Sequence, residues 1–370
     1  MRRRARLLVA RGRGYWSRAG ASLFDNLELL HSATEGKLSF YNVPLVKEIG
    51  RYIHRVHIAG DWFVNFADAS AKAHPEGLLI RRYGEAIQDV ELESFGALLA
   101  AQSTGLGTIG RSLPALFHAG RPVKSVAPLV REAWMPGTQV CTARRQAGTA
   151  EGLYFAAQGG HNAESHNHND VGNFILFSNG DPVLIDVGVE TYTAKTFSSK
   201  RYEIWTMQSA YHNCPTINGA MQAAGRQYEA RDVAFHSDDA GATFSADLAA
   251  AYPAEAGVRS WLRKIHLDRR TNSLELSDTY ALRTANDLAM SFITPCAAMT
   301  DGNVVTLSGG MLTKGTVRIS VDAAQTPRFA VEEIDVTDRR LQGVWGNRLR
   351  RILISWQKPS ANGTLRFRIT

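Results

Sequence analysis

A short segment between residues 159 and 170 holds more side chains capable of chemistry than any other part of the chain. It reads GGHNAESHNHND and lies just before an apolar stretch. In an extended backbone, side chains two residues apart point to the same side, so His166 and His168 would present two imidazoles along one edge. Zinc sites favour imidazole nitrogens combined with a carboxylate. The segment is therefore a candidate zinc site.

Two residues further along the chain are candidate ligands for the same metal. Asp186 is an acidic residue within the apolar stretch 183–187, where an unpaired charge would be costly. His212 adds a third imidazole, between a tyrosine and an asparagine. The alternative is that these are hydrogen-bonded polar residues in loops, as most isolated histidines are. Spacing alone leaves both interpretations open.

A zinc site of these residues requires the chain to bend between His168 and the strand that follows it. An Asn-Gly pair at 179–180 predicts a tight turn between two strands. That turn places Asp186 opposite Asn173 and away from His168. The chain must then bend between residues 170 and 172 to bring His168 back, and the glycine at 172 permits such a bend.

The first third of the chain has the periodicity of helices. Apolar residues recur at the spacing of one helical face, Ser22 is placed to cap the first helix, and Pro44 suits the first turn of the second. This helical pattern ends between residues 133 and 138, where we place a domain boundary. The predicted helices span residues 22–30, 44–56, 77–88 and 91–102.

From about residue 139 the pattern changes to short strands and turns. No helix-length period recurs in this half, and no internal repeat is visible. Such a run of short segments predicts an antiparallel β-sandwich. The predicted strands include residues 152–157, 174–177, 183–187, 305–307, 317–321 and 365–369.

Length and composition are those of a globular protein with two domains. The chain has 370 residues, of which 44% are hydrophobic and 21% charged. The three cysteines, Cys141, Cys214 and Cys296, are far apart and form no CxxC pair. They therefore indicate neither a disulfide framework nor a cysteine zinc site.

The net charge of +7 comes from the start of the chain. Residues 1–20 hold seven arginines and no acidic residue, and the remaining 35 basic residues equal the 35 acidic residues in number. A basic stripe on a folded face, as nucleic-acid binding requires, is not evident. The start also has too short an apolar run for a signal peptide, and no stretch is long enough for a membrane span. We expect residues 1–14 to be disordered.

Four segments together resemble the heparinase II/III-like polysaccharide lyases. They are HNHNDVGNF at 166–174, PVLID at 182–186, AYHN at 210–213 and YWSRAGASLFD at 15–25. The resemblance implies an α+β multidomain protein, in which a partial (α/α) toroid is followed by an antiparallel β-sandwich. The implied division is 1–14 for the arginine-rich start, 15–135 for the toroid and 136–370 for the β-domain.

The same resemblance implies roles for individual residues. His168, Asp186 and His212 match the ligands of a Zn²⁺ ion, and His166 matches a catalytic histidine. Tyr15 matches the toroid tyrosine that donates or accepts a proton. Tyr192 matches a catalytic tyrosine that lines the cleft, with Tyr202 as its rival. The predicted substrate contacts are Gln158, Asn162, Glu164 and Tyr202.

The implied reaction is the cleavage of a uronic-acid-containing acidic polysaccharide, such as a glycosaminoglycan or alginate, by β-elimination. A base removes the C5 proton and a tyrosine protonates the leaving oxygen. One alternative is a non-catalytic remnant that binds acidic sugars. A second is a zinc hydrolase, which would need Glu164 as general base although no HExxH helix surrounds it.

In the family, the toroid is longer and supplies an asparagine–histidine pair upstream of the tyrosine. From this difference we expect an N-terminally truncated member with little activity of its own. The resemblance implies a periplasmic or secreted protein. The chain shows no signal peptide, so a genuine start at Met1 would make it cytoplasmic.

Overall fold

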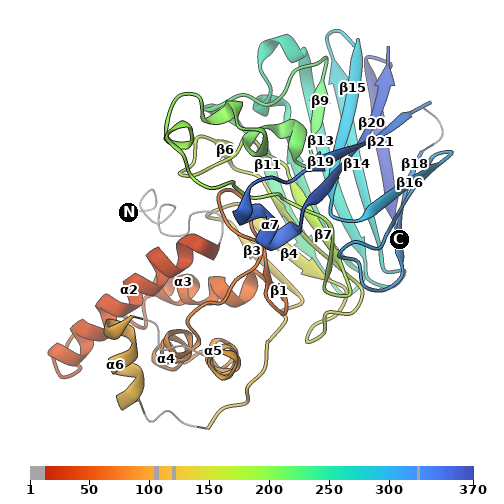
Figure 1. The fold of residues 1–370 in the computed structure, drawn as a ribbon. Coiled ribbons are helices and arrows are strands. Elements are labelled where there is room, and N and C mark those ends of the chain that lie inside the picture. The colour runs from red at the N-terminus through yellow and green to blue at the C-terminus, as the bar shows by residue number, and fades with distance from the viewer. Residues whose placement is uncertain (1–12, 104–107, 119–121, 323–325) are drawn as a thin grey trace.

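The computed structural model describes residues 13–103, 108–118, 122–322 and 326–370, with only the backbone for residues 13–15. The helices of the first third gather on one side of the molecule and the large antiparallel sheets lie on the other, with the short helix α7 (Arg339–Trp345) beside the sheets (Figure 1). Residues 1–12 of the arginine-rich start, predicted to be disordered, lie outside the described residues. Residues 13 and 14 already belong to the first described helix.

The helical side contains the four predicted helices, but the start of the first was wrong, and a fifth helix and a short pair of strands were not predicted. The first helix runs through Ser22, so the predicted cap at this residue is wrong. Pro44 does occupy the first turn of the second helix, where its missing N–H is not needed. The helices are α2 (Arg13–Ala33), α3 (Pro44–Arg55), α4 (Gly77–Ala86), α5 (Val90–Gln102) and α6 (Ile109–Phe117).

Glycine allows α4 and α5 to pack with their backbones almost in contact. A Cβ atom at Gly84 would overlap the backbone of Glu93, and one at Gly96 would overlap that of Arg81. Between α3 and α4 the chain forms the short strands β1 (His57–Ala59) and β2 (Trp62–Phe63). The loop that follows β2 carries Asp68 toward the sheets.

Three antiparallel sheets form the other side. The five-stranded sheet has the order β3-β4-β5-β7-β8 and the four-stranded sheet the order β19-β20-β15-β9. The eight-stranded sheet has the order β11-β12-β13-β14-β21-β18-β17-β16. The strands are β3 (Glu132–Met135), β4 (Val140–Arg144), β5 (Leu153–Gln158), β7 (Phe174–Ser178), β8 (Asp181–Leu184), β9 (Pro215–Ile217), β11 (Arg231–Ser237), β12 (Gly241–Asp247), β13 (Val258–Asp268), β14 (Ser273–Leu282), β15 (Asp287–Thr294), β16 (Ala297–Asp301), β17 (Val304–Ser308), β18 (Thr316–Val321), β19 (Arg328–Asp335), β20 (Arg348–Gln357) and β21 (Asn362–Ile369).

The five-stranded sheet is buried on both faces, which explains its continuous apolar strands. On one face, Leu153 and Phe155 of β5 join the core shared with the eight-stranded sheet. On the other face, Tyr154 and Ala156 join the core shared with the helices. This sheet therefore lies between the helices and the sandwich, and the loops at its ends are held from both sides.

The four-stranded sheet continues the five-stranded one. The amide of Ile185 donates to the carbonyl of Ile293 at 2.9 Å, and residues of both sheets belong to the core beneath the eight-stranded sheet. The result is a two-layer antiparallel sandwich, as predicted. That the helices form part of a toroid, and that the domains divide at 135/136, remain predictions.

Some smaller features complete the fold. The predicted hairpin around residues 179–180 is confirmed as β7 and β8. Two short strands, β6 (His161–Asn162) and β10 (Gly225–Glu229), and one short helix, α7 (Arg339–Trp345), were not predicted. The three cysteines are buried free thiols. Within the described ranges, none of the helices combines the length and apolar character that a membrane crossing requires.

Candidate metal centre and adjoining active site

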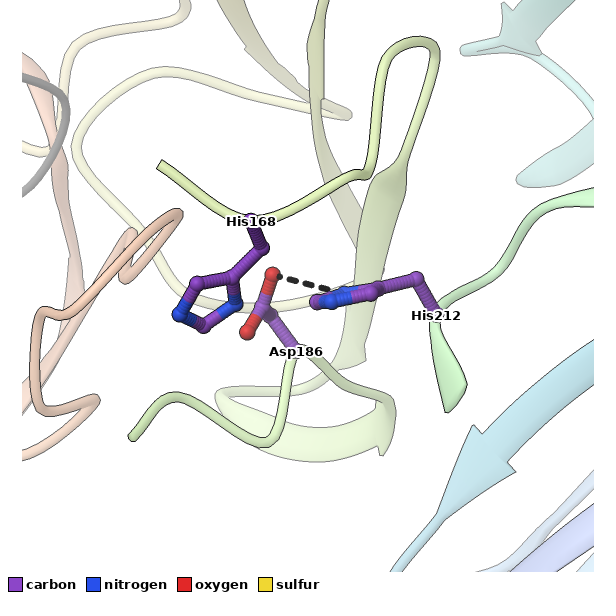
Figure 2. A group of neighbouring side chains, drawn as sticks. All are labelled: His168, Asp186 and His212. Atoms are coloured by element: carbon purple, nitrogen blue, oxygen red, sulfur yellow. Dashed lines mark ion pairs between the residues drawn. The ribbon is translucent and has the colours of Figure 1, made fainter. Parts of the chain in front are cut away.

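Three buried side chains form a candidate metal centre at the edge of the five-stranded sheet (Figure 2). His168, Asp186 and His212 are each 0% exposed, and their ligand atoms lie within 4.8 Å of one another. His168 precedes β7, Asp186 follows β8, and His212 precedes β9. Nδ1 of His212 lies 3.3 Å from Oδ2 of Asp186. The predicted convergence of these three residues is therefore present in the fold.

The bend that this convergence requires is also present. Gly172 has a φ of 80°, a left-handed conformation that favours glycine. The Asn173 amide donates to Oδ2 of Asp186 at 2.8 Å, but the predicted register is wrong. A register shift between Leu176 and Phe177 pairs Leu176 with Leu184, and β8 ends before Asp186. The amide of Gly188 donates to Oδ1 of Asp186, also at 2.8 Å. These bonds fix the carboxylate that faces the two imidazoles.

The residues present fit a zinc ion. Nδ1 of His168 is buried and has no hydrogen-bond partner among the described residues, whereas its Nε2 lies 3.1 Å from a carboxylate oxygen of Asp68. Nε2 of His212 likewise lies 3.1 Å from the carbonyl of Thr206. Each ring thus has one nitrogen held by an acceptor, as is usual for metal-ligating histidines. Two imidazoles and a carboxylate are a common zinc donor set.

The electrostatics of the centre favour a cation. Burial lowers the pKa of His212, but the charge of Asp186 and its hydrogen bond outweigh that effect and raise the pKa overall. A metal ion bound there would replace the His212 proton beside the same carboxylate, so its binding would release a proton.

A second cluster adjoins the metal centre and is built around Asp68. Oδ2 of Asp68 lies 3.0 Å from Nδ1 of His166 and accepts the hydroxyl of Tyr192 at 3.0 Å. Oδ1 accepts from Arg201 at 2.6 Å, in addition to its contact with His168. Burial raises the pKa of Asp68, but His168 and Arg201 lower it to about 2 overall. Asp68 is therefore an ionised carboxylate at the centre of the cluster.

The backbone of the histidine segment is not extended. His166 has a φ of 60°, so the expectation of two imidazoles along an extended edge is wrong. Both rings still reach Asp68, His166 with 31% of its side chain exposed and His168 fully buried. The His166 ring stacks against Tyr192 with centroids 6.5 Å apart. Of the two histidines, His166 is thus the one whose ring reaches the surface.

Other predicted residues lie around this loop. Gln158 and Asn162 are buried, and their amides bond to Asp170 and Gln222. Glu164 lies 3.7 Å from His161. As substrate contacts these residues remain predictions, and in the fold their side chains hold the loop.

The three predicted tyrosines differ in their positions. Tyr192 is 37% exposed and adjoins His166, whereas Tyr202 donates to Oδ1 of Asn167 at 2.9 Å and burial raises its pKa. Tyr15 lies on α2, but its side chain is outside those described. Of the two rivals, Tyr192 is the one that shares a partner with His166.

Sequence reasoning missed the residues that position this site. Asp68 and Arg201 carried no local signal, because their partners lie far away in the sequence. Asn173 and Asn213 stood inside the quoted motifs, yet their function became visible only in the fold. The amide of Asn213 donates to the carbonyls of Phe174 and Ile185, and these two hydrogen bonds connect β7 to the end of β8.

A buried ion pair supports the centre from behind. Arg263 of β13 and Asp278 of β14 are cross-strand partners with fully buried side chains 2.7 Å apart. The Arg263 guanidinium also donates to the carbonyls of Gly172 and Asn213. It thereby joins the sandwich to the two loops that carry the histidines.

Replacing Asp278 by alanine should therefore lower the free energy of unfolding by about 3–5 kcal/mol, because the arginine would be left buried without its counter-charge. Chemical denaturation measures this change. The matched control is Asp335→Ala, which breaks an exposed Arg348–Asp335 pair and should change the stability little. Equal effects of the two substitutions would show that the buried pair has no special part in stability.

Comparison with known proteins agrees with this architecture. A family model described as "Heparinase II/III-like, C-terminal" matches residues 147–338, a range that includes the three candidate ligands. No curated protein matches the chain.

Several solved structures share the fold. The heparan sulfate lyase HepC from Pedobacter heparinus has a TM-score of 0.68 at 14% identity, over 95% of this chain and 50% of that one. A heparinase III, the BT4657 gene product, has a TM-score of 0.69 at 11% identity, over 98% and 51%. A Paenibacillus xanthan lyase has a TM-score of 0.54 at 12% identity, over 95% and 38%. The chain thus spans about half the length of the first two structures.

Proposed function

We propose that this chain, which belongs to the family of heparinase II/III-like C-terminal domains, is part of a polysaccharide lyase. The proposed substrate is an acidic polysaccharide or oligosaccharide that contains uronic acid, and the proposed reaction is β-elimination. The observation that supports this most is the position of His166, a partly exposed imidazole held beside Tyr192 and next to a buried centre of zinc-ligand type.

In this proposal His166 removes the C5 proton of the uronic acid. Its ring is oriented by a carboxylate at 3.0 Å, as a general base requires. The electrons of the C–H bond form the C4–C5 double bond while the bond from C4 to the glycosidic oxygen breaks. Tyr15 of the helical side is the proposed donor of the proton to the leaving oxygen. Tyr192 is the proposed tyrosine that holds the sugar beside His166.

A Zn²⁺ ion would be held by His168, Asp186 and His212. When bound, it supplies positive charge and rigidity to the loop that bears His166. Three protein ligands leave the fourth position of a tetrahedral zinc ion open, so the ligand set by itself does not decide between the two reactions. Elimination is preferred because Glu164, the base that zinc hydrolysis would need, lies outside any helix and beside His161.

The proposal is tested with a panel of polymers that contain uronic acid, including glycosaminoglycans of the heparan type and alginate. Elimination produces an unsaturated uronate that absorbs in the near ultraviolet. The protein produced from its own gene should generate this absorbance on at least one polymer. Binding to a polymer without any absorbance would instead support a sugar-binding remnant. Because such polymers lie outside the cytoplasm, the proposed location is periplasmic or secreted.

A further inference from the structure

Asp68 is the one buried carboxylate among the described residues that contacts both histidines of the active-site loop. It lies on the loop between β2 and α4, outside the range that the family model matches. Its side chain is fully buried. Arg340, from the far end of the chain, donates to its backbone carbonyl at 3.1 Å. Asp68 is therefore held in place from the helical side and from the sheets.

Arg201, which is always charged, lies 2.6 Å from Oδ1 of Asp68 and pairs with it as a carboxylate. A carboxylate can only accept hydrogen bonds, so all four of its partners must act as donors. For Tyr192 and Arg201 this is their ordinary role. For the two histidines it determines which nitrogen carries the hydrogen. His166 contacts Asp68 through Nδ1 and His168 contacts it through Nε2. The two rings therefore carry their hydrogens on opposite nitrogens.

We propose that Asp68 is a positioning residue that fixes opposite tautomers of His166 and His168. The Nδ1–H form of His166 has its lone pair on Nε2, where a base would use it. The Nε2–H form of His168 has its lone pair on Nδ1, the buried nitrogen of the candidate metal centre. One carboxylate from the helical side thereby determines which nitrogen is available as a base in His166 and which is available as a metal ligand in His168. The part that concerns the base rests on the proposed function, whereas the part that concerns the tautomers does not.

Arg201 makes this arrangement stable. Its guanidinium donates to Oδ1 of Asp68 at 2.6 Å and to the carbonyl of Asn167 at 3.1 Å. The charge of the carboxylate is thus balanced inside the protein, and the same arginine holds the backbone between the two histidines.

The experiment is ¹⁵N spectroscopy of the imidazoles in the zinc-loaded protein, with and without Asp68→Asn. The signals of the two rings are assigned from the spectra of His166→Gln and His168→Gln. In the native protein we expect the hydrogen on Nδ1 of His166 and on Nε2 of His168. An asparagine has one acceptor oxygen and one donor group, so it cannot accept from all four partners. We therefore expect Asp68→Asn to move His166 toward the Nε2–H form and to weaken zinc binding by about 10–100-fold.

The matched control is Asp89→Asn. Asp89 also belongs to the helical side and pairs with an arginine at 2.6 Å, but it caps the start of α5, where its side chain accepts from the amide of Leu92. Its substitution should leave both tautomers and the zinc affinity unchanged. An Nε2–H form of His166 in the native protein would overturn the proposal without any variant. If Asp68→Asn keeps both tautomers and the zinc affinity and only melts at a lower temperature, Asp68 stabilises the fold without positioning the histidines, and the proposal is wrong.

Neither readout needs a substrate. A protein without lyase activity can still show the predicted tautomers, and an active lyase can fail to show them. The two proposals are therefore tested separately. If activity is found, Asp68→Asn should lower kcat more than it changes KM, because the residue orients a group that acts in the transition state.

Discussion

Replacing His166 by alanine is expected to lower turnover by about 100-fold or more, the lower end of what general acid–base catalysis contributes. The reason is that this ring is the partly exposed imidazole beside Tyr192. The same substitution should leave the zinc content and the melting temperature close to those of the native protein. His166 contributes no ligand atom to the candidate metal centre, and a group that acts only in the transition state can be lost without unfolding the protein.

Initial rates, elemental analysis and thermal unfolding check this result on one preparation of protein. The matched control is His236→Ala, which removes an exposed imidazole of β11 that pairs with Asp238. The control should retain its activity. Loss of zinc from His166→Ala would contradict the assignment of His166 to catalysis and of His168 to the metal.

Replacing His168 by alanine should remove the zinc and lower the melting temperature. The native protein should contain about one zinc per chain, and His168→Ala should contain almost none. Because the free energy of metal binding is also folding free energy, the variant should melt at a lower temperature. Asp186, which is fully buried, would keep its contacts with Asn173, Gly188 and His212 but would lose the cation that its charge faces. Turnover should fall as well, since the metal stiffens the loop that bears His166.

Metal analysis after purification without chelator and thermal unfolding with and without added zinc measure these effects. Added zinc should raise the melting temperature of the native protein but not that of His168→Ala. A native protein that binds no metal and melts at the same temperature with zinc would exclude the centre. If His166→Ala loses the metal while His168→Ala keeps it, the two assignments are reversed.

Much of this architecture follows from local pattern. The strands of the five-stranded sheet were predictable as short apolar runs and many of the later strands by their alternation, and the hairpin because Asn-Gly at 179–180 favours a tight turn. The bend at Gly172 followed from a geometric requirement, and the structure has it. The cap at Ser22 failed because tertiary packing extends α2 through a weak local signal.

The metal ligands and the residues that orient them differ in how visible they are. His168 and His212 lie in short polar motifs, and Asp186 is an acidic residue within an apolar stretch. The sequence alone therefore marks all three as candidates. Asp68 lies 100 residues before His168, in a loop with no periodicity, and only the packing of the helices on the sheet brings them together. The left-handed backbone at His166 was equally hidden, because a non-glycine residue adopts it only when its surroundings require it.

The mass of the smallest product tests the proposed chemistry most directly. The protein produced from its own gene is incubated with the polymer on which it is most active, and the disaccharide is analysed by mass spectrometry beside the His166→Ala variant. Elimination predicts an unsaturated product that is lighter by one molecule of water than the product of hydrolysis, and it predicts very little of this product from the variant. A saturated disaccharide of the hydrolysis mass, formed equally well by the variant, would contradict the account.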